Sequence, residues 1–244
     1  MSSAAPARVP WVVGVSGASG TPYAAAVLRG LLAAGLPVDL VISRAARLTL
    51  LDETGVAWHD GDWATSLTTW LAQALDAGEA GPGGDTGEAG EAAPGMAAAD
   101  LAAAVRALVE VHAAGNLAAA PSSGSHPTRG MIVVPASTAS LAGIALGLSK
   151  DLLQRAADVT LKEGRRLVVV PREMPYTGAT LRHMLALHDA GAVVAAASPG
   201  FYAGARRAGD LVDFVAGRVL DAAGVDHALY RRWAGDLGGA RQSR

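Results

Sequence analysis

The sequence predicts an α/β protein with a doubly wound parallel sheet that carries helices on both faces. Short apolar runs rich in Val and Ile alternate along the chain with helical patterns, an order typical of parallel strands joined by helical crossovers. These runs are apolar on both sides, so each strand is expected to be buried between two helical layers. A chain of 244 residues with 51% hydrophobic and 17% charged residues is long enough to build such a core.

The first part of the sheet is expected to come from two strand–helix units. Residues 11–15 predict a strand, and residues 23–34 carry the spacing of a helix. A second apolar run at 38–42 predicts the next strand, followed by a helix through 45–52. The later part of the chain continues the alternation, with strands expected at 131–134, 167–170 and 193–196 and helices at 140–147, 180–190 and 211–223.

One segment interrupts this alternation. Residues 76–95 are rich in Gly, Glu, Ala and Pro and hold too little apolar surface to order themselves, which predicts a disordered insertion at the surface. The domain is therefore expected to span residues 11–226, after a short flexible N-terminus at 1–10. A less regular tail follows at 227–244.

Composition excludes several classes of function. A formal net charge of −2 offers no basic surface for nucleic acid, and the lack of cysteine excludes disulfides, thiolate nucleophiles and zinc–cysteine sites. No apolar run reaches the roughly 18 residues that would cross a membrane. The first ten residues also lack the core of a signal peptide, so a cytoplasmic protein is expected.

The first strand ends in a glycine-rich motif, Gly14-Val15-Ser16-Gly17-Ala18-Ser19-Gly20, directly before a helix. Backbone N–H groups and the positive end of the helix dipole at such a junction favour a phosphate. The G-x-x-G-x-x-G spacing differs from the G-x-G-x-x-G motif of dinucleotide-binding proteins, and the lysine of the nucleoside-triphosphate loop is missing. The motif therefore predicts a phosphate site outside both of these classes, with a plain strand-to-helix turn as the alternative.

Other expected strand ends also carry polar groups. Ser122-Ser123-Gly124-Ser125 precedes one strand and Pro135-Ala136-Ser137-Thr138-Ala139-Ser140 follows it, which provides hydroxyls either for an anion or for an ordinary helix N-cap. The next strand is followed by Pro171-Arg172-Glu173-Met174-Pro175. Arg172 could hold an oxyanion and Glu173 could move a proton, or the two could form a structural ion pair.

A last group of residues is compatible with a second phosphate. Tyr202 follows the final expected strand and Arg218 lies on the last expected helix. Arg155, Asp158 and Lys162 are spaced i, i+3 and i+7 on one helical stretch, which also describes an ordinary salt-bridged surface. Each group has a structural explanation, but their shared position at strand ends favours a ligand site, because ligands of open parallel sheets bind at the carboxyl ends of the strands.

Taken in order, these motifs resemble those of the UbiX-type flavin prenyltransferases over about residues 11–226. The most specific run is Arg155-Ala156-Ala157-Asp158, then Leu161-Lys162-Glu163, then Pro171-Arg172-Glu173. The resemblance implies a flavodoxin-like fold that binds FMN and transfers a dimethylallyl group from its monophosphate to N5 and C6 of reduced FMN without a metal. It further implies a homo-oligomer, typically a dodecamer with sites built across subunits, and a UbiD-type decarboxylase as recipient of the prenylated FMN.

The resemblance also assigns roles to individual residues. FMN would be held by Gly17, Ala18, Ser19, Ser43, Ser137, Thr138, Ala139, Ser140 and Arg172. The dimethylallyl phosphate would be bound by Arg155, Lys162, Tyr202, Arg218 and Trp233, with Trp233 closing over the site from the C-terminal tail. Ser19 and Glu173 would be catalytic and handle protons, Glu173 by protonating the departing phosphate.

The chain departs from the family pattern in places, and two alternatives stay open. Many members carry Cys-Pro-Cys-Ser where this chain has Val134-Pro135-Ala136-Ser137, and Ala139 replaces a longer side chain. One alternative is an FMN-dependent cysteine decarboxylase of the same superfamily, for which His112 and His126 would be the nearby candidate bases. The other is a non-catalytic FMN-binding subunit of a decarboxylase complex, against which the intact set of polar residues argues.

Overall fold

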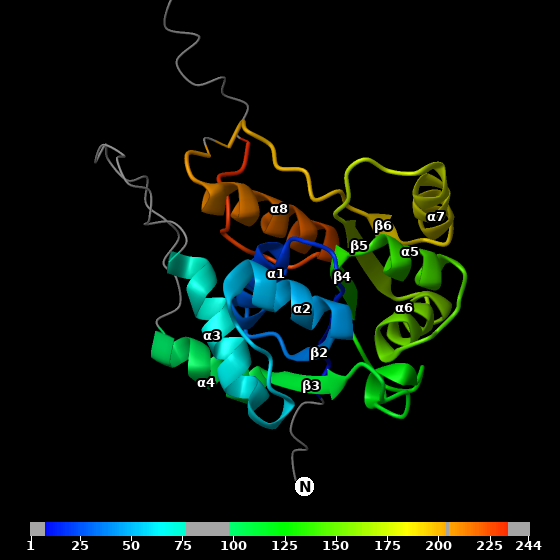
Figure 1. Ribbon diagram of the computed structural model, residues 1–244, viewed down its shortest axis with the longest axis horizontal. Coiled ribbons are helices and arrows are strands. Elements are labelled where there is room, and N and C mark those ends of the chain that lie inside the picture. The colour runs from blue at the N-terminus through cyan, green and yellow to red at the C-terminus, as the bar shows by residue number, and fades with distance from the viewer. Residues whose placement is uncertain (1–7, 77–97, 204, 234–244) are drawn as a thin grey trace, which may run out of the picture.

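The computed structural model describes residues 8–76, 98–203 and 205–233. Its centre is a parallel sheet with the strand order β3-β2-β1-β4-β5-β6 (Figure 1). The strands are β1 (Trp11–Val15), β2 (Val38–Ile42), β3 (Val109–Ala113), β4 (Gly130–Ala136), β5 (Arg166–Pro171) and β6 (Val193–Val194). The expected doubly wound α/β fold is therefore confirmed.

The strand order reverses direction at β1. The chain first builds outward through β2 to β3, then returns to place β4 on the other side of β1. This is the doubly wound order 3-2-1-4-5-6, and without the edge strand β3 it is the flavodoxin-like order 2-1-3-4-5. The carboxyl ends of β1 and β4 therefore flank the crevice in which ligands of such sheets bind.

Helices cover both faces of the sheet. They are α1 (Thr21–Ala33), α2 (Arg44–Thr54), α3 (Trp63–Asp76), α4 (Ala98–Leu108), α5 (Thr138–Ala145), α6 (Leu152–Lys162), α7 (Gly178–Asp189) and α8 (Ala208–Ala223). Figure 1 shows α5, α6 and α7 gathered on one side and α1, α3, α4 and α8 on the other. None of the described helices is both long and apolar enough to cross a membrane.

Alternate residues of each strand supply two separate cores. Val13 and Ile132 pack with residues of α1, α3 and α8, whereas Val12 and Met131 pack with residues of α5 and α6. Neighbouring residues of a strand point to opposite faces, so two apolar faces require a nearly continuous apolar run. This arrangement explains why the central strands are recognisable in the sequence.

Some elements differ from the expectations. The helices α3 and α4 and the strand β3 were not predicted, and β6 ends at Val194 rather than at Ala196. The sequence of β3, Val-Glu-Val-His-Ala, alternates apolar and polar residues because this strand lies at the edge of the sheet. Apart from Asp76 at the end of α3, the segment expected to be a disordered insertion lies outside the described residues.

Candidate functional site

The loop after β1 is fastened to the loop after β4. Ser16 is buried, and its hydroxyl donates to the Pro135 carbonyl at 2.8 Å. The same hydroxyl accepts a hydrogen bond from the Ser137 N–H at 2.7 Å. The two polar loops that the sequence places at separate strand ends therefore form one continuous surface across the crevice.

Glycine is required at two places in the opening loop. A Cβ at Gly17 would lie 2.4 Å from the Cβ of Ala45, so this part of the loop lies directly on the first turn of α2. Gly20 has a φ of 117°, a backbone conformation that residues with a side chain resist. The motif thus brings the backbone of β1 against α2 and turns it sharply into α1.

The N-terminus of α1 holds a protein carboxylate that the sequence motif does not predict. Glu53 of α2 accepts hydrogen bonds from the N–H groups of Gly20 at 2.9 Å and Thr21 at 2.8 Å, and from the Thr21 hydroxyl at 2.6 Å. Burial alone would raise the pKa of Glu53, but hydrogen bonds from Thr21, Ser19 and Gly20 lower it. The anion expected at this helix end is therefore Glu53, and the exposed Ser19 lies beside it.

Two other helix N-termini lie at the crevice with serine caps. Ser43 caps α2 by accepting from the Ala46 N–H at 3.1 Å, and Ser137 caps α5 by accepting from the Ser140 N–H at 3.2 Å. The capping alternative given for the segment 135–140 is thus confirmed for Ser137, and Ser43 caps α2 in the same way. The first N–H groups of each helix still have no intrahelical acceptor, so both ends can bind an anion.

Arg172 enters the crevice from the end of β5. Its Cγ would lie 3.7 Å from a Cβ at Gly20, and its buried Nε finds no hydrogen-bond partner among the described residues. A buried guanidinium N–H without an acceptor is costly, which indicates that a ligand supplies the acceptor. Arg172 is the structure's clearest sign of a bound oxyanion or carbonyl group.

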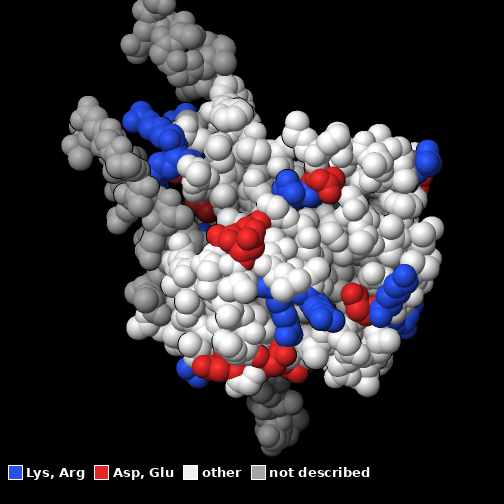
Figure 2. Space-filling model, viewed as in Figure 1, with Lys and Arg blue, Asp and Glu red and all other residues white. Residues whose placement is uncertain are grey.

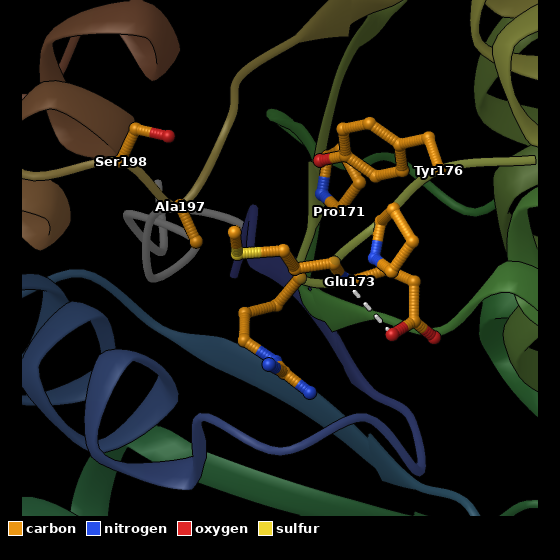
Figure 3. Close-up of a pocket in the computed structure, with 8 residues that line it drawn as sticks. Pro171, Glu173, Tyr176, Ala197 and Ser198 are labelled. Atoms are coloured by element: carbon orange, nitrogen blue, oxygen red, sulfur yellow. Dashed lines mark hydrogen bonds between the residues drawn. The ribbon is translucent and has the colours of Figure 1, made fainter.

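A pocket of about 350 Å³ lies beside Arg172. Figure 3 shows Pro171, Glu173 and Tyr176 on one side of it and Ala197 and Ser198, which follow β6, on the other. Glu173 is exposed and its carboxylate turns back to accept from the Met174 N–H at 3.0 Å. Its carboxylate carries no ion pair within the described chain, so it is free to meet a substrate.

Tyr202, Arg218 and Trp233 come together near α8. The Tyr202 ring packs edge-on against Trp233 and Phe214, with ring centroids 6.1 and 5.4 Å apart. Hydrogen bonding to Tyr230, with the nearby Asp221 and Tyr202, raises the pKa of the Arg218 guanidinium. Three of the five residues expected to bind the dimethylallyl phosphate, Tyr202, Arg218 and Trp233, therefore lie in one cluster.

Arg155 and Lys162 lie elsewhere in the same chain. Both belong to α6, which packs with α5 against one face of the sheet, whereas α8 packs against the other face with α1. Arg155 pairs with Asp158 at 2.7 Å, as their spacing predicts, and Lys162 pairs with Glu163. One chain thus does not unite these two cations with Tyr202 and Arg218.

A separate group of polar residues lies away from the crevice. Asp39 in β2 and Glu110 and His112 in β3 have ligand atoms close enough together to suggest a metal site. However, the Asp39 carboxylate already pairs with Arg8 at 2.6 Å and with His126 at 2.9 Å. These contacts describe an ion-pair cluster that joins the N-terminal segment to the sheet.

The surface carries exposed apolar side chains between sparse charges. On the face shown in Figure 2, Lys, Arg, Asp and Glu gather in small groups separated by broad uncharged surface. Leucines from several helices and their adjoining loops are at least 47% exposed, namely Leu48, Leu51, Leu146, Leu148, Leu181 and Leu185. Where such side chains adjoin one another they are typical of an interface with another protein chain, so these leucines are its candidate positions.

Comparison with known proteins supports a common family. The family model described as Flavoprotein matches residues 2–220. A flavin prenyltransferase UbiX of Streptomyces coelicolor is 63% identical over 233 residues, which cover 96% of this chain and 99% of that protein.

Two solved structures are similar over nearly their whole length. The crystal structure of AnUbiX in complex with FMN and dimethylallyl pyrophosphate has 35% identity and a TM-score of 0.71, and the match covers 94% of this chain and 99% of the other. A dodecameric FMN-dependent UbiX-like decarboxylase from Escherichia coli O157:H7 has 35% identity and a TM-score of 0.70, with coverage of 93% and 100%.

Proposed function

The chain belongs to the UbiX-type flavin prenyltransferases of the flavoprotein family, and from this premise we propose how its residues transfer a dimethylallyl group from its phosphate ester to FMN. The observation that carries the proposal is the buried Nε of Arg172, which has no hydrogen-bond partner among the described residues and whose side chain reaches from the end of β5 toward Gly20 in the loop after β1. When bound there, reduced FMN supplies the nucleophilic N5 and C6 atoms that accept the prenyl group.

The residues around the crevice suit FMN. We assign its phosphate to the N-termini of α2 and α5, because the α1 terminus is already filled by Glu53. Ser43 and the segment Ser137–Ser140 would hold that phosphate through hydroxyl and N–H groups. Gly17, Ala18 and Ser19 would lie along the flavin, and Arg172 would donate its free Nε–H to an acceptor on the cofactor.

The prenyl phosphate is assigned to the cluster at α8. Arg218 and the Tyr202 hydroxyl would bind its oxygens and stabilise the negative charge that develops as the carbon–oxygen bond breaks. Trp233 would cover the prenyl chain and exclude water from the allylic cation. Arg155 and Lys162 would complete the phosphate site from a neighbouring subunit, since they cover the opposite face of the sheet in their own chain.

An oligomer follows from this assignment. The exposed leucines of α2, of α7 and of the loop after α5 provide the apolar surface that such contacts need, and the similar protein from Escherichia coli is dodecameric. We propose a homo-oligomer, a dodecamer as in that relative, in which each site draws residues from two chains.

Two acid–base groups serve the reaction. Glu173 would protonate the departing phosphate, because it is exposed at the pocket and has no competing ion pair among the described residues. Ser19, which hydrogen-bonds to Glu53, would relay a proton given up by the flavin ring to that carboxylate, which its hydrogen bonds hold in the ionised form. We propose that the cytoplasm holds the enzyme and that a UbiD-type decarboxylase receives the prenylated FMN.

A mass measurement tests this function. The protein is incubated anaerobically with reduced FMN and dimethylallyl monophosphate, and the flavin is then analysed for the added prenyl mass. Formation of prenylated FMN is expected, and it should fall sharply in an Arg218→Ala variant that still binds FMN. Unchanged flavin would overturn the proposal, and release of carbon dioxide from a peptide with a C-terminal cysteine would identify the decarboxylase alternative instead.

A further inference from the structure

The carboxylate of Asp221 is the centre of a polar cluster on α8. It accepts hydrogen bonds from the Tyr230 hydroxyl at 2.6 Å, Arg232 at 2.8 Å and Arg218 at 3.1 Å. The side chain of Asp221 is only 17% exposed, so these partners replace most of its contact with water. One carboxylate thus joins the phosphate-binding Arg218 to two residues of the C-terminal segment.

His227 adds a fourth donor to Asp221. Its Nδ1 accepts a hydrogen bond from the Leu229 N–H at 3.2 Å, which leaves Nε2 to carry the proton. Nε2 lies 3.0 Å from Oδ1 of Asp221, the oxygen that also accepts from Arg232, so the neutral ring donates to the carboxylate. His227 is 3% exposed, which makes this contact part of the protein interior and fixes where the C-terminal segment begins.

The segment 227–233 packs against α8 as well as forming hydrogen bonds with it, and we call the segment seated when these contacts are made. A Cβ at Gly217 would lie 2.5 Å from a ring carbon of Tyr230 and 2.7 Å from one of His227. Tyr230 also packs against Phe214 with ring centroids 5.0 Å apart, and Phe214 contacts Tyr202. Since Tyr202 in turn contacts Trp233, the seated segment and the proposed prenyl-phosphate site share one aromatic cluster.

The net charge of the cluster favours the binding of a phosphate. Two guanidinium groups face one carboxylate while His227 is neutral, so the joined groups carry one net positive charge. The i, i+3 contact limits the rotamers of Arg218, which without Asp221 would sample many orientations in solvent. An arginine that is already held loses less entropy when it binds a phosphate.

We propose that Asp221 is a positioning residue for prenyl transfer: it orients Arg218 and seats segment 227–233, so that this segment and the prenyl phosphate favour each other's binding. The inference rests on the proposed role of Arg218 in binding the phosphate. Linkage requires that the effect be reciprocal: if the seated segment raises substrate affinity by some factor, bound substrate stabilises the seated segment by the same factor.

The wild-type protein tests this coupling directly. Trypsin must bind the guanidinium of Arg232 to cleave after it, so Arg232 has to leave Asp221 first, and the cleavage rate follows the fraction of molecules in which this contact is open. In the holoprotein with oxidised FMN, which allows binding without turnover, dimethylallyl monophosphate is expected to slow this cleavage several-fold, as measured by intact mass. A rate that does not respond to saturating ligand would overturn the proposal.

An Asp221→Asn variant tests the residue. It is expected to raise the KM for dimethylallyl monophosphate about tenfold and to speed cleavage after Arg232 by a similar factor, while the Kd for FMN stays unchanged. Asp221→Glu, which restores the charge, should recover most of both effects. A KM and a cleavage rate within twofold of wild type in Asp221→Asn would contradict the inference.

Asp213→Asn is the matched control on the same helix. Asp213 pairs with Arg29 at 3.7 Å and lies outside the cluster, and burial raises its pKa, so a neutral side chain is tolerated there. This variant should keep wild-type KM and cleavage rate. Absence of prenyl transfer in the wild type would overturn the proposed function, whereas wild-type behaviour of Asp221→Asn would overturn only the role of Asp221.

Discussion

The two ends of the sheet use polar residues in opposite ways. In the amino-terminal half of β2, Asp39 is 1% exposed and is surrounded by Arg8, His112 and His126, which hold its pKa at about 2 against the effect of burial. At the carboxyl ends, Arg172 keeps a buried Nε that has no partner in the described part of the chain, and Glu173 carries an exposed carboxylate. The Asp39 carboxylate is thus paired by Arg8 and His126, with His112 Nε2 near it but without a hydrogen bond of its own, whereas Arg172 and Glu173 face the pocket without an ion-pair partner among the described residues.

The largest expected effect at the carboxyl edge is on catalysis. Glu173→Gln removes the proposed proton donor but keeps the shape of the side chain, so kcat should fall on the order of 10² to 10⁴-fold. FMN binding and the thermal unfolding temperature should stay at wild-type values, because the one hydrogen bond that the Glu173 carboxylate makes to a described residue is with the Met174 N–H of its own loop. Full turnover in single-turnover assays would remove Glu173 from the mechanism.

A second change at the same edge should act on cofactor binding. Arg172→Ala removes the donor of an expected charge-assisted hydrogen bond, worth about 1.5 to 3 kcal/mol, so FMN should bind roughly 10 to 150-fold more weakly. Fluorescence titration measures this Kd. The free energy of unfolding of the apoprotein should not fall, since an unpartnered buried group is removed. Unchanged FMN affinity would contradict the assignment of Arg172.

The same kind of change at the other end should act on stability. Asp39→Asn leaves Arg8 and two histidines around a neutral group, and the free energy of unfolding should fall by about 3 kcal/mol. The kcat per folded molecule should be unchanged, because the cluster does not line the crevice. Denaturant unfolding with and without FMN measures the loss of stability, and an activity assay on the folded variant measures kcat. A loss of kcat would contradict the view that the Asp39 cluster serves stability alone.

Acid pH should reveal a smaller effect of the same carboxylate. The pKa of Asp39 is about 2 in the folded protein against an ordinary 3.8, so its ionised form contributes about 2 kcal/mol of stability above pH 4. That contribution is lost as the pH falls from about 4 to 2, because both states then bind the proton. The difference in unfolding free energy between wild type and Asp39→Asn should therefore shrink over this range, and a constant difference would show that Asp39 acts through packing alone.

The central sheet could be predicted from sequence because a strand buried on both faces is a continuous apolar run. The strand β3 could not be predicted in this way. It lies at the edge of the sheet, so Glu110 and His112 interrupt its apolar residues, and five residues of alternating pattern are too few to identify a strand. Arg172 and Tyr202 could be named as candidates because each follows a strand directly. Glu53 could not: it is one more acidic residue on α2 until the fold brings that helix against the start of α1.

Because Lys162 on α6 and Arg218 on α8 lie apart in one chain, two mutant alleles of the gene are expected to complement each other. Under the proposed arrangement, two gene copies that each encode an inactive protein, one with Lys162→Ala and one with Arg218→Ala, assemble mixed oligomers in which some sites receive both intact residues. Such a pair restores part of the activity, although neither allele supports any alone. A substitution of Lys162 would also impair sites whose other residues come from wild-type subunits, so one mutant gene copy would lower the activity of subunits encoded by the normal copy.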